Sequence, residues 1–347
     1  MNTDVLIIGQ GISGTWLSFY LEKNGIDYFV IDQENPHTAS RQAGGLINPV
    51  TGRNKVKTWL ADQLLPFCMT AYQQIGDYLG IAVVESKAII ECFTNPEAAA
   101  LFSRRVKENP QYLEIPNANP IQLNLFQNCK ELGLIKPALV VNVPLLLSQW
   151  RAKLRGLGKI GEYNFDLNHL IETDKGFKYQ HISCKRIIFC DGATIQERNI
   201  STSIPLAPTK GEALILKIKG LPSSYVYKNK LTLLPLAETD YWWVGSSYEW
   251  AFEHTRPTSL FKEQTVLALE KWLAIPFEVI EQRAAVRMGT MERRPLVGFD
   301  SPEKKWGLLN GMGTKGCSLA PYFASQLVEN MIQGSAIDPE ANCTRFQ

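Results

Sequence analysis

The chain has 347 residues, of which 45% are hydrophobic and 20% are charged, and its formal net charge is +2 at pH 7. This composition is typical of a globular enzyme. The near-neutral charge argues against nucleic acid or an acidic membrane surface as a partner, because a strong global field is absent. The chain is too long for one compact core of usual size, so we expect two closely joined domains.

Cysteine and histidine spacing excludes the common metal motifs. The chain has seven cysteines without a CxxC pair, which is typical of reduced thiols in a cytoplasmic protein. The first predicted strand begins at Val5, which leaves no room for a signal peptide, and no apolar run is long enough to cross a bilayer. We expect no metal site and interpret the four histidines as surface or loop residues: His37, His169, His181 and His254.

The chain begins with a βαβ pattern. A buried strand is predicted over Val5–Ile8, and a helix follows until Asn24, with Gly25 suited to its end. A second strand ends in the acid Asp32. The turn after the first strand has the spacing Gly-x-Gly-x-x-Gly, which in this context is a dinucleotide-binding fingerprint.

Each glycine of this fingerprint has an expected role. Gly9 permits the tight turn, Gly11 lets the backbone approach a pyrophosphate, and Gly14 lets helix and strand pack closely. The free N–H groups at the helix start would face the phosphates. Asp32 would accept hydrogen bonds from both ribose hydroxyls and would repel a 2′-phosphate. Three neighbours complete the predicted cofactor contacts of this region: Ile12, Ser13 and Gln33.

Small residues follow a polar stretch that ends at Arg41. They favour a backbone that runs close against something flat, and a plain surface loop with two glycines remains the alternative. A mostly helical segment is predicted over Lys57–Leu79. The predicted cofactor-binding residues of the small stretch are Arg41, Gln42, Ala43, Gly44 and Gly45.

A second domain is predicted to begin near residue 81. Strands are expected over Ile81–Val84 and Ala88–Ile90, followed by a helix over Pro96–Val106. We expect Leu134–Leu154 to return to the first domain. The helix of that segment begins at Val143, which is a further predicted cofactor contact, and Pro144 is tolerated in its first turn.

The middle of the chain is predicted to add strands to both domains. Arg186–Cys190 has the pattern of a buried strand, and it meets Asp191 and Gly192 in a turn suited to the back of a dinucleotide site. From Pro205 strands alternate again, and a helix is expected over Thr258–Leu273. We expect three tryptophans to lie in the core or in a cavity wall: Trp242, Trp243 and Trp250.

The C-terminal segment predicts a second helix start delivered by glycines. Gly307–Asn310 is predicted as a strand, and Ser318–Ile332 as a helix. A helix dipole there would stabilise negative charge on a reduced ring, which a flavin enzyme needs and a nicotinamide enzyme does not. The predicted cofactor contacts of the intervening turn are Gly311, Gly313, Thr314, Lys315, Gly316 and Cys317.

Five segments, in the right order, carry a resemblance to one known family. They are Ala43–Pro49, Pro208–Glu212, Trp243–Ser247, Ala285–Gly298 and Gly311–Pro321. With the N-terminal fingerprint, they resemble the glycine oxidase, sarcosine oxidase and D-amino-acid oxidase family of FAD-dependent oxidoreductases over nearly the whole chain. The resemblance implies FAD rather than NAD, and amine oxidation as the default chemistry.

The resemblance also implies an architecture. We expect an α/β chain with a Rossmann-type FAD-binding domain and a discontinuous substrate domain built on a mixed or antiparallel sheet. The FAD-binding domain is predicted over residues 1–80, 130–204 and 285–347, and the substrate domain over residues 81–129 and 205–284.

The chain departs from the family pattern at several positions. Ala284, Ala285 and Val286 stand where one branch has a cysteine that carries the flavin, so we expect FAD to bind without a covalent bond. Met288 replaces the usual proline after Arg287. The lysine that helps oxygen react in that branch is absent from Trp242-Trp243-Val244, and the tyrosine of glycine oxidase is absent near Leu233-Leu234-Pro235.

The resemblance implies a reaction and one catalytic candidate, Arg287, and the sequence offers Lys315 as a second. A hydride leaves the α-carbon of a small amino acid or secondary amine for flavin N5, and the imine product hydrolyses. Arg287 stands where family members hold the substrate carboxylate, for which a guanidinium offers a rigid fork. A structural salt bridge is the alternative for Arg287. Lys315 is either a second positive group near the ring or a plain surface lysine.

Three alternative functions share the fold. The electron acceptor is molecular oxygen or another acceptor, and a dehydrogenase that uses a quinone or a carrier protein is favoured slightly by the missing lysine. An oxidase of carboxymethylated tRNA wobble uridine is weakened by the near-neutral charge. A flavin-binding scaffold without catalysis is the third alternative. The sequence leaves the oligomeric state open.

Overall fold

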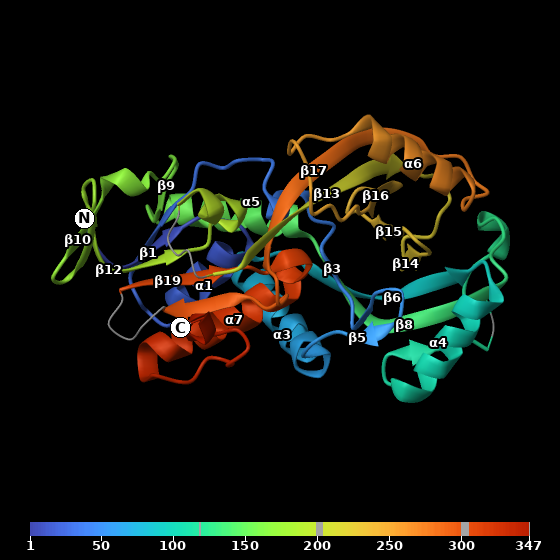
Figure 1. Ribbon diagram of the computed structural model, residues 1–347, viewed down its shortest axis with the longest axis horizontal. Coiled ribbons are helices and arrows are strands. Elements are labelled where there is room, and N and C mark those ends of the chain that lie inside the picture. Colours follow the sequence, from blue (N-terminus) through green and yellow to red (C-terminus); the bar gives the residue numbers. More distant parts are fainter. Residues whose placement is uncertain (118, 199–203, 300–304, 347) are drawn as a thin grey trace.

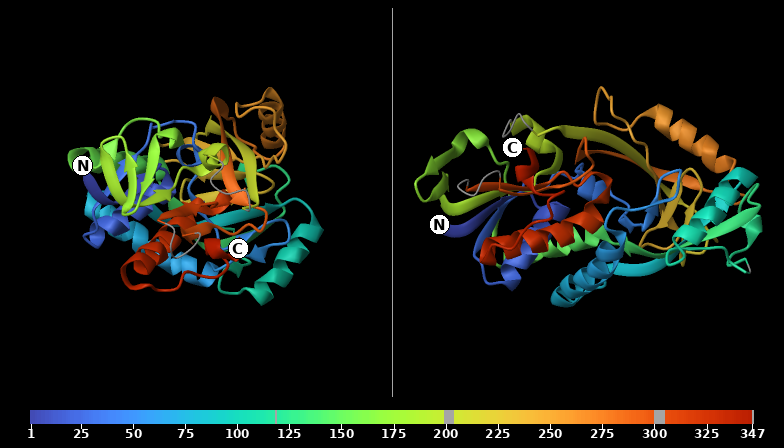
Figure 2. Two further views of the ribbon diagram at one scale, coloured as in Figure 1. Left: turned by 60° about the vertical axis from the view of Figure 1, so that its left-hand side comes forward. Right: turned by 60° about the horizontal axis from the view of Figure 1, so that its bottom comes forward.

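The computed structural model describes residues 1–117, 119–198, 204–299 and 305–346. Two large sheets organise these residues, and each lies in its own part of an elongated molecule (Figure 1). Both termini lie in the part that holds the first sheet, whereas α4 and α6 lie at the other end (Figure 2). The α/β fold class expected from the sequence is confirmed. No helix of the described residues has the length and apolarity to cross a membrane.

The first sheet is built around the N-terminal strand. β1 (Asn2–Ile8) lies between β2 (Tyr28–Ile31) and β12 (Ile182–Phe189) and runs parallel to both. Residues Val5 to Ile8 are almost fully buried, as expected for a parallel strand covered on both faces. Five more described strands complete this sheet: β9 (Ile160–Gly161), β10 (Leu170–Thr173), β11 (Gly176–Tyr179), β18 (Leu296–Phe299) and β19 (Trp306–Asn310).

Helices cover the first sheet where the sequence predicted them. α1 (Ile12–Lys23) follows β1, and α7 (Gly316–Gln333) packs against both α1 and α3 (Ala61–Leu79). Figure 1 shows α3 and α7 below the sheet. The other described helices are α2 (Ala39–Gln42), α4 (Pro96–Glu108), α5 (Val143–Gly156), α6 (Ser259–Glu270) and the short 3-10 helices η1 (Leu123–Leu125), η2 (Leu167–His169), η3 (Gly192–Arg198), η4 (Gly313–Lys315) and η5 (Cys343–Phe346).

The second sheet is mixed, as expected. Its strands follow the order β17, β13, β16, β15, β14, β6, β8 and β3, with β7 beside β8. β14 pairs with β6 in parallel, and the other pairs are antiparallel. The bounds are β3 (Leu46–Ile47), β6 (Val84–Phe93), β7 (Leu113–Glu114), β8 (Glu131–Val141), β13 (Leu206–Lys217), β14 (Tyr225–Lys228), β15 (Thr232–Pro235), β16 (Tyr241–Gly245) and β17 (Glu278–Thr290), and a separate hairpin joins β4 (Val50–Thr51) to β5 (Val56–Lys57).

The pairing of β8 moves one boundary of the predicted domains. The sequence places residues from 130 onward in the first domain, but β8 pairs with β6 and β3 in the second sheet. The chain returns only at Asn142, whose side chain caps α5. Residues 285–290 of β17 likewise pair within the second sheet. Buried strands of both sheets have similar apolar sequence patterns, so the sequence alone did not show which sheet these residues join. We propose the same two domains with these boundaries shifted.

The three tryptophans expected in the core or a cavity wall have different surroundings. Trp242 is fully buried in the second sheet, and Trp243 lines the cavity described below. Trp250 is 48% exposed and packs edge-on against Tyr248, so the expectation of a buried Trp250 is wrong. Trp250 lies in the loop after β16, where the alternation of the strand no longer directs it inward.

Candidate functional site

One cavity of about 870 Å³ runs between the two sheets and reaches both predicted glycine-led helix starts. Its size lies in the upper part of the range for ligand pockets. Three predicted contacts do not line it, namely Gly14, Arg41 and Gly311. The predicted residues that do line it are Gly9, Gly11, Ile12, Ser13, Asp32, Gln33, Gln42, Ala43, Gly44, Gly45, Val143, Asp191, Gly192, Arg287, Gly313, Thr314, Lys315, Gly316 and Cys317.

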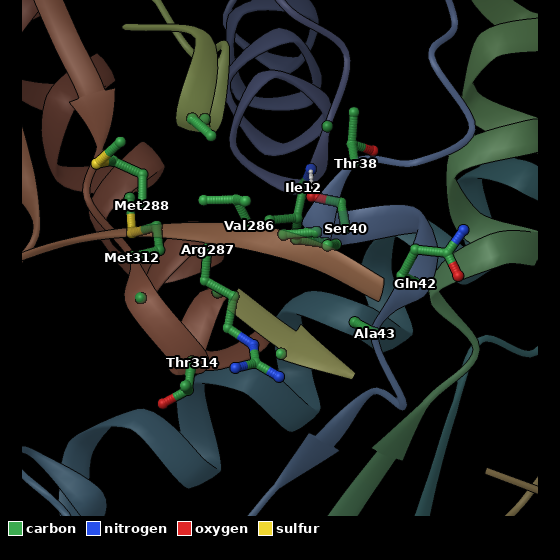
Figure 3. A pocket seen from close by; sticks show the side chains of 18 of the residues that line it. Ile12, Thr38, Ser40, Gln42, Ala43, Val286, Arg287, Met288, Met312 and Thr314 are labelled. Carbon is green, nitrogen blue, oxygen red and sulfur yellow. Dashed lines mark hydrogen bonds between the residues drawn. The ribbon is translucent and has the colours of Figure 1, made fainter. Parts of the chain in front are cut away.

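The start of α1 has a free donor that faces the cavity. Gly9 has φ +100°, and a Cβ at Gly14 would lie 1.9 Å from the Gly9 carbonyl oxygen, so both positions require glycine. The Ile12 N–H donates to Ser40 Oγ at 3.0 Å (Figure 3). The N–H group of Ser13, which lines the cavity, has no partner in the described chain. This arrangement suits a phosphate group.

Asp32 belongs to a buried polar network that the sequence did not reveal. Its Oδ2 accepts from the Gln10 N–H at 2.8 Å, and its Oδ1 accepts from the Glu34 N–H and from Arg151 at 2.7 Å. Arg151, from α5, is 1% exposed. A carboxylate has about four acceptor positions, and three of them are used within the protein. At least one acceptor position of Asp32 therefore remains for a donor from outside the protein.

The segment around Gly44 is pressed against the second sheet. A Cβ at Gly44 would lie 2.8 Å from the Trp243 ring, and the Trp243 Nε1–H donates to the Gln42 carbonyl at 3.2 Å. Gly45 has φ +85°, and a Cβ there would lie 2.0 Å from the Val141 carbonyl oxygen. These close approaches support the prediction that this backbone runs against a flat group and argue against a plain surface loop. The Trp243 ring is one such flat group.

The turn after β12 is closed by a buried ion pair. Asp191 bonds to Arg198 at 2.5 Å and accepts from Asn310 Nδ2 at 3.3 Å. Burial raises the pKa of the Asp191 carboxyl, and the Arg198 charge opposes this shift. The Asn310 side chain also donates to the Gly192 carbonyl, which joins β12 to β19. Neither Arg198 nor Asn310 was predicted. Arg198 contacts Asp191 around a turn, and Asn310 is 119 residues away from Asp191 in the sequence.

Arg287 extends from β17 into the cavity, between Thr314 and Ala43 (Figure 3). Its Nη2 donates to Ser246 Oγ at 2.9 Å and its Nη1 to the Ser247 carbonyl at 3.3 Å. Its guanidinium covers Gly211, where a Cβ would lie 1.8 Å from Nη2. Burial lowers the pKa of Arg287, and no carboxylate of the described residues forms an ion pair with it. The alternative of a structural salt bridge is therefore not what the described chain shows.

The second helix start brings another positive group to the cavity. Lys315 lies at the end of η4, directly before α7, and forms no ion pair with the described residues. Burial lowers the pKa of Lys315, and the charges of Arg294 and Arg293 lower it further. Burial also raises the pKa of the neighbouring Cys317 thiol to about 12, so this thiol is neutral at physiological pH. The cavity therefore presents Arg287 and Lys315 to an anionic group.

The described residues contain no group of three or more histidines, cysteines or acids placed to hold a metal ion. All four histidines are exposed, as predicted. His37 lines the cavity together with Asp32 and Gln33, on the β2 side of the first sheet.

Comparison with known proteins identifies one family over most of the chain. A family model described as "FAD dependent oxidoreductase" matches residues 4–330.

Solved structures show the same fold at low sequence identity. Iminodiacetate oxidase from Chelativorans sp. BNC1 has a TM-score of 0.78 at 20% identity, covering 99% of this chain and 98% of that one. Glycine oxidase from Geobacillus kaustophilus has a TM-score of 0.79 at 17% identity, covering 100% and 98%. L-proline dehydrogenase from P. horikoshii has a TM-score of 0.74 at 17% identity, covering 99% and 98%. At these identities the similarity shows a shared fold.

Proposed function

The chain belongs to the family of FAD-dependent oxidoreductases, and from this premise we propose that it oxidises the C–N bond of a small amino acid or secondary amine. The family confirms the expected FAD cofactor. The observation that supports the substrate class is Arg287, a half-buried guanidinium that faces the cavity and has no carboxylate partner in the described chain. Such a group binds an external carboxylate through two hydrogen bonds.

The residues of the cavity fit FAD. The free N–H group of Ser13 at the start of α1 would hold the pyrophosphate, and Asp32 would hold the adenosine ribose. The start of α7 supplies the positive dipole end that a reduced flavin ring requires. No cysteine stands at Ala284, Ala285 or Val286, so the proposal keeps FAD non-covalent.

In the proposed reaction the chain binds and orients the amine. Bound FAD would supply the acceptor for a hydride from the α-carbon, and the imine formed would hydrolyse. Arg287 would fix the carboxylate, and Lys315 would add positive charge on the side of α7. An amine that binds in its neutral form needs no protein base, which agrees with the absence of a histidine on β17, η4 and the start of α7.

The names of similar structures support this substrate class. The similar structures include an iminodiacetate oxidase, a glycine oxidase, an L-amino acid deaminase and an L-proline dehydrogenase. Each compound in these names has an amine beside a carboxylate. The set covers primary and secondary amines, so it does not favour one of them.

An anaerobic screen tests the proposal. Glycine, sarcosine, proline and D-amino acids are added separately to the purified holoprotein without oxygen, and the yellow flavin band is followed. At least one of them should bleach the band. A flavin that none of these compounds, nor any other carboxylated amine, reduces would contradict the proposal and favour a flavin-binding scaffold.

A dehydrogenase that uses an acceptor other than oxygen is the second candidate. One branch of the family has a lysine in this strand that promotes the reaction with oxygen, whereas this chain has Trp242, Trp243 and Val244 there. Lys210, on the adjoining strand β13, is fully buried, pairs with Glu212 at 3.0 Å, and lies on the face of β13 opposite Gly211. Peroxide release in air that is much slower than anaerobic bleaching would support the dehydrogenase.

A further inference from the structure

The floor of the cavity between β17 and β14 combines small residues with the Trp243 ring. Thr232 of β15 lies opposite Lys228 of β14 on one side and opposite Gly245 of β16 on the other. Gly245 in turn pairs with Ala213 of β13. All four residues line the cavity. The cavity lining therefore continues from Lys228 to the strand beside Arg287, with the Trp243 ring against Gly245, where a Cβ would lie 2.9 Å from it.

A buried cluster of three charges lies at the far end of this floor. Glu91 of β6 is paired in register with Lys228 of β14. The Lys55 ammonium, from the turn between β4 and β5, bonds to Glu91 Oε1. Lys55 is 8% exposed and Glu91 is 4% exposed. Two lysines and one carboxylate leave the cluster with an excess positive charge.

This excess charge resides on Lys228. Its ammonium forms no ion pair or hydrogen bond with the described residues, whereas Glu91 is already engaged by Lys55. Burial lowers the pKa of Lys228, with Glu91 opposing the shift and Lys55 adding to it. A desolvated cation without a partner is costly, and a bound anion would relieve that cost.

The other charges at this end of the cavity are also positive or already neutralised. Lys230 is exposed, and Arg283 is paired with Glu281. Glu212, the acid nearest to the floor, accepts from Thr258 and Gln282 and pairs with Lys210. Glu91 Oε2 has no hydrogen-bond partner among the described residues, but the single carboxylate of Glu91 cannot neutralise both Lys55 and Lys228.

We propose that the cavity binds an amine that carries two acidic groups, one held by Arg287 and the other by Lys228. The inference rests on the proposed amine oxidation and specifies its substrate. The Arg287 guanidinium lies over β13, and three strand spacings of about 4.8 Å place β14 roughly 14 Å from β13. The Lys228 side chain spans part of that distance. The remaining gap cannot be bridged by the single carboxylate that Arg287 holds, and a second acidic group would bridge it.

A matched substrate series tests the second acidic group. The series consists of iminodiacetate, N-(2-carboxyethyl)glycine and N-(3-carboxypropyl)glycine, each compared with the neutral amide of its distal carboxyl. For the length that fits, the diacid should reduce the flavin with a kcat/KM at least about tenfold above that of its amide, which matches one charged hydrogen bond. Lys228→Met should remove this advantage and leave the rate with the amide within about twofold.

Binding without reaction separates this inference from the proposed function. Glutarate and adipate are titrated against their monoamides, and the change in the flavin spectrum of the oxidised holoprotein gives Kd. The diacid should bind at least about tenfold more tightly than its monoamide, and Lys228→Met should abolish the difference. Lys219→Met, at an exposed position outside the cavity, serves as the control and should leave it intact.

The outcomes are distinct. If diacid binding depends on Lys228 but no amine reduces the flavin, the proposed reaction fails and the second anion subsite stands. If diacids and monoamides bind equally, or if Lys228→Met weakens both alike, the inference is overturned. The melting temperature checks folding. Lys228→Met should not lower it, because Lys55 and Glu91 remain paired, whereas Glu91→Gln should lower it by leaving two cations together.

Discussion

At the scale of single residues, the account depends on Arg287. Two hydrogen bonds to Ser246 and Ser247 fix its guanidinium, yet no acid of the described chain neutralises it. The protein thereby holds a positive charge in place for an external anion. The sequence identified Arg287 only through a family resemblance, because no local pattern distinguishes a ligand-binding arginine from one in a salt bridge.

Replacing Arg287 should damage substrate binding more than cofactor binding. Losing a charged hydrogen bond costs about 1.5–3 kcal/mol, so Arg287→Ala should weaken the binding of carboxylated amines at least about tenfold. Arg287→Lys should recover only part of this loss, because an ammonium lacks the planar fork. KM for the substrate found in the screen, measured with bound flavin quantified, checks the prediction. An unchanged KM with flavin retained would reject the role of Arg287.

Lys315 should make carboxylate binding depend on pH. Its pKa is lowered by burial and by Arg294 and Arg293, so its positive charge is lost at a lower pH than for an exposed lysine. Binding of an anionic inhibitor should therefore weaken as pH rises toward that lowered pKa. Inhibitor Kd measured from neutral to alkaline pH should show this decline, and Lys315→Met should flatten it. The same decline in both proteins would assign the effect elsewhere.

At the scale of elements, local and long-range information separate clearly. The βαβ unit of β1, α1 and β2 was predicted because its glycines, its helix and its terminal acid are neighbours in sequence. The pairing of β8 with β6 was not, since either sheet accepts the same apolar strand. The contact of Arg151 with Asp32 was missed because 119 residues separate them in the sequence.

The approach of β13 to Arg287 provides an element-scale prediction. A Cβ at Gly211 would lie 1.8 Å from the Arg287 guanidinium, which is the movable end of a side chain. Gly211→Ala should therefore shift the guanidinium while keeping the fold, and raise KM for the carboxylated amine at least about tenfold. Gly156→Ala, where a Cβ meets nothing within 4 Å, is the matched control. Equal KM values for the two variants would contradict the prediction.

At the scale of the whole molecule, the cavity joins the two sheets. One wall comes from β1, α1 and η4, and the other from β13, β16 and β17. Most residues of the first wall had been singled out from the sequence, because dinucleotide-binding fingerprints are local motifs. It did not predict the Lys55, Glu91 and Lys228 cluster, whose members come from three separate segments and meet only when the second sheet forms.

A cofactor that bridges both walls should stabilise the entire molecule. Binding to the native state alone adds about 2.7 kcal/mol when free ligand is 100 times Kd. FAD added to the apoprotein should therefore raise the melting temperature in a single transition. FMN or AMP, each of which is only part of FAD, should raise it less. Calorimetry of the apoprotein with each compound checks this, and equal shifts with FMN and FAD would show that only the ring is bound.

The central claim is that FAD and a carboxylate-binding arginine share one cavity for amine oxidation. The most direct measurement is the rate of anaerobic flavin reduction with a carboxylated amine and with the same amine lacking its carboxylate, in the wild type and in Arg287→Ala. The account predicts rapid bleaching only for the carboxylated amine in the wild type, with at least about a tenfold loss of efficiency in the variant. Equal bleaching by both amines, or equal efficiency in both proteins, would contradict it.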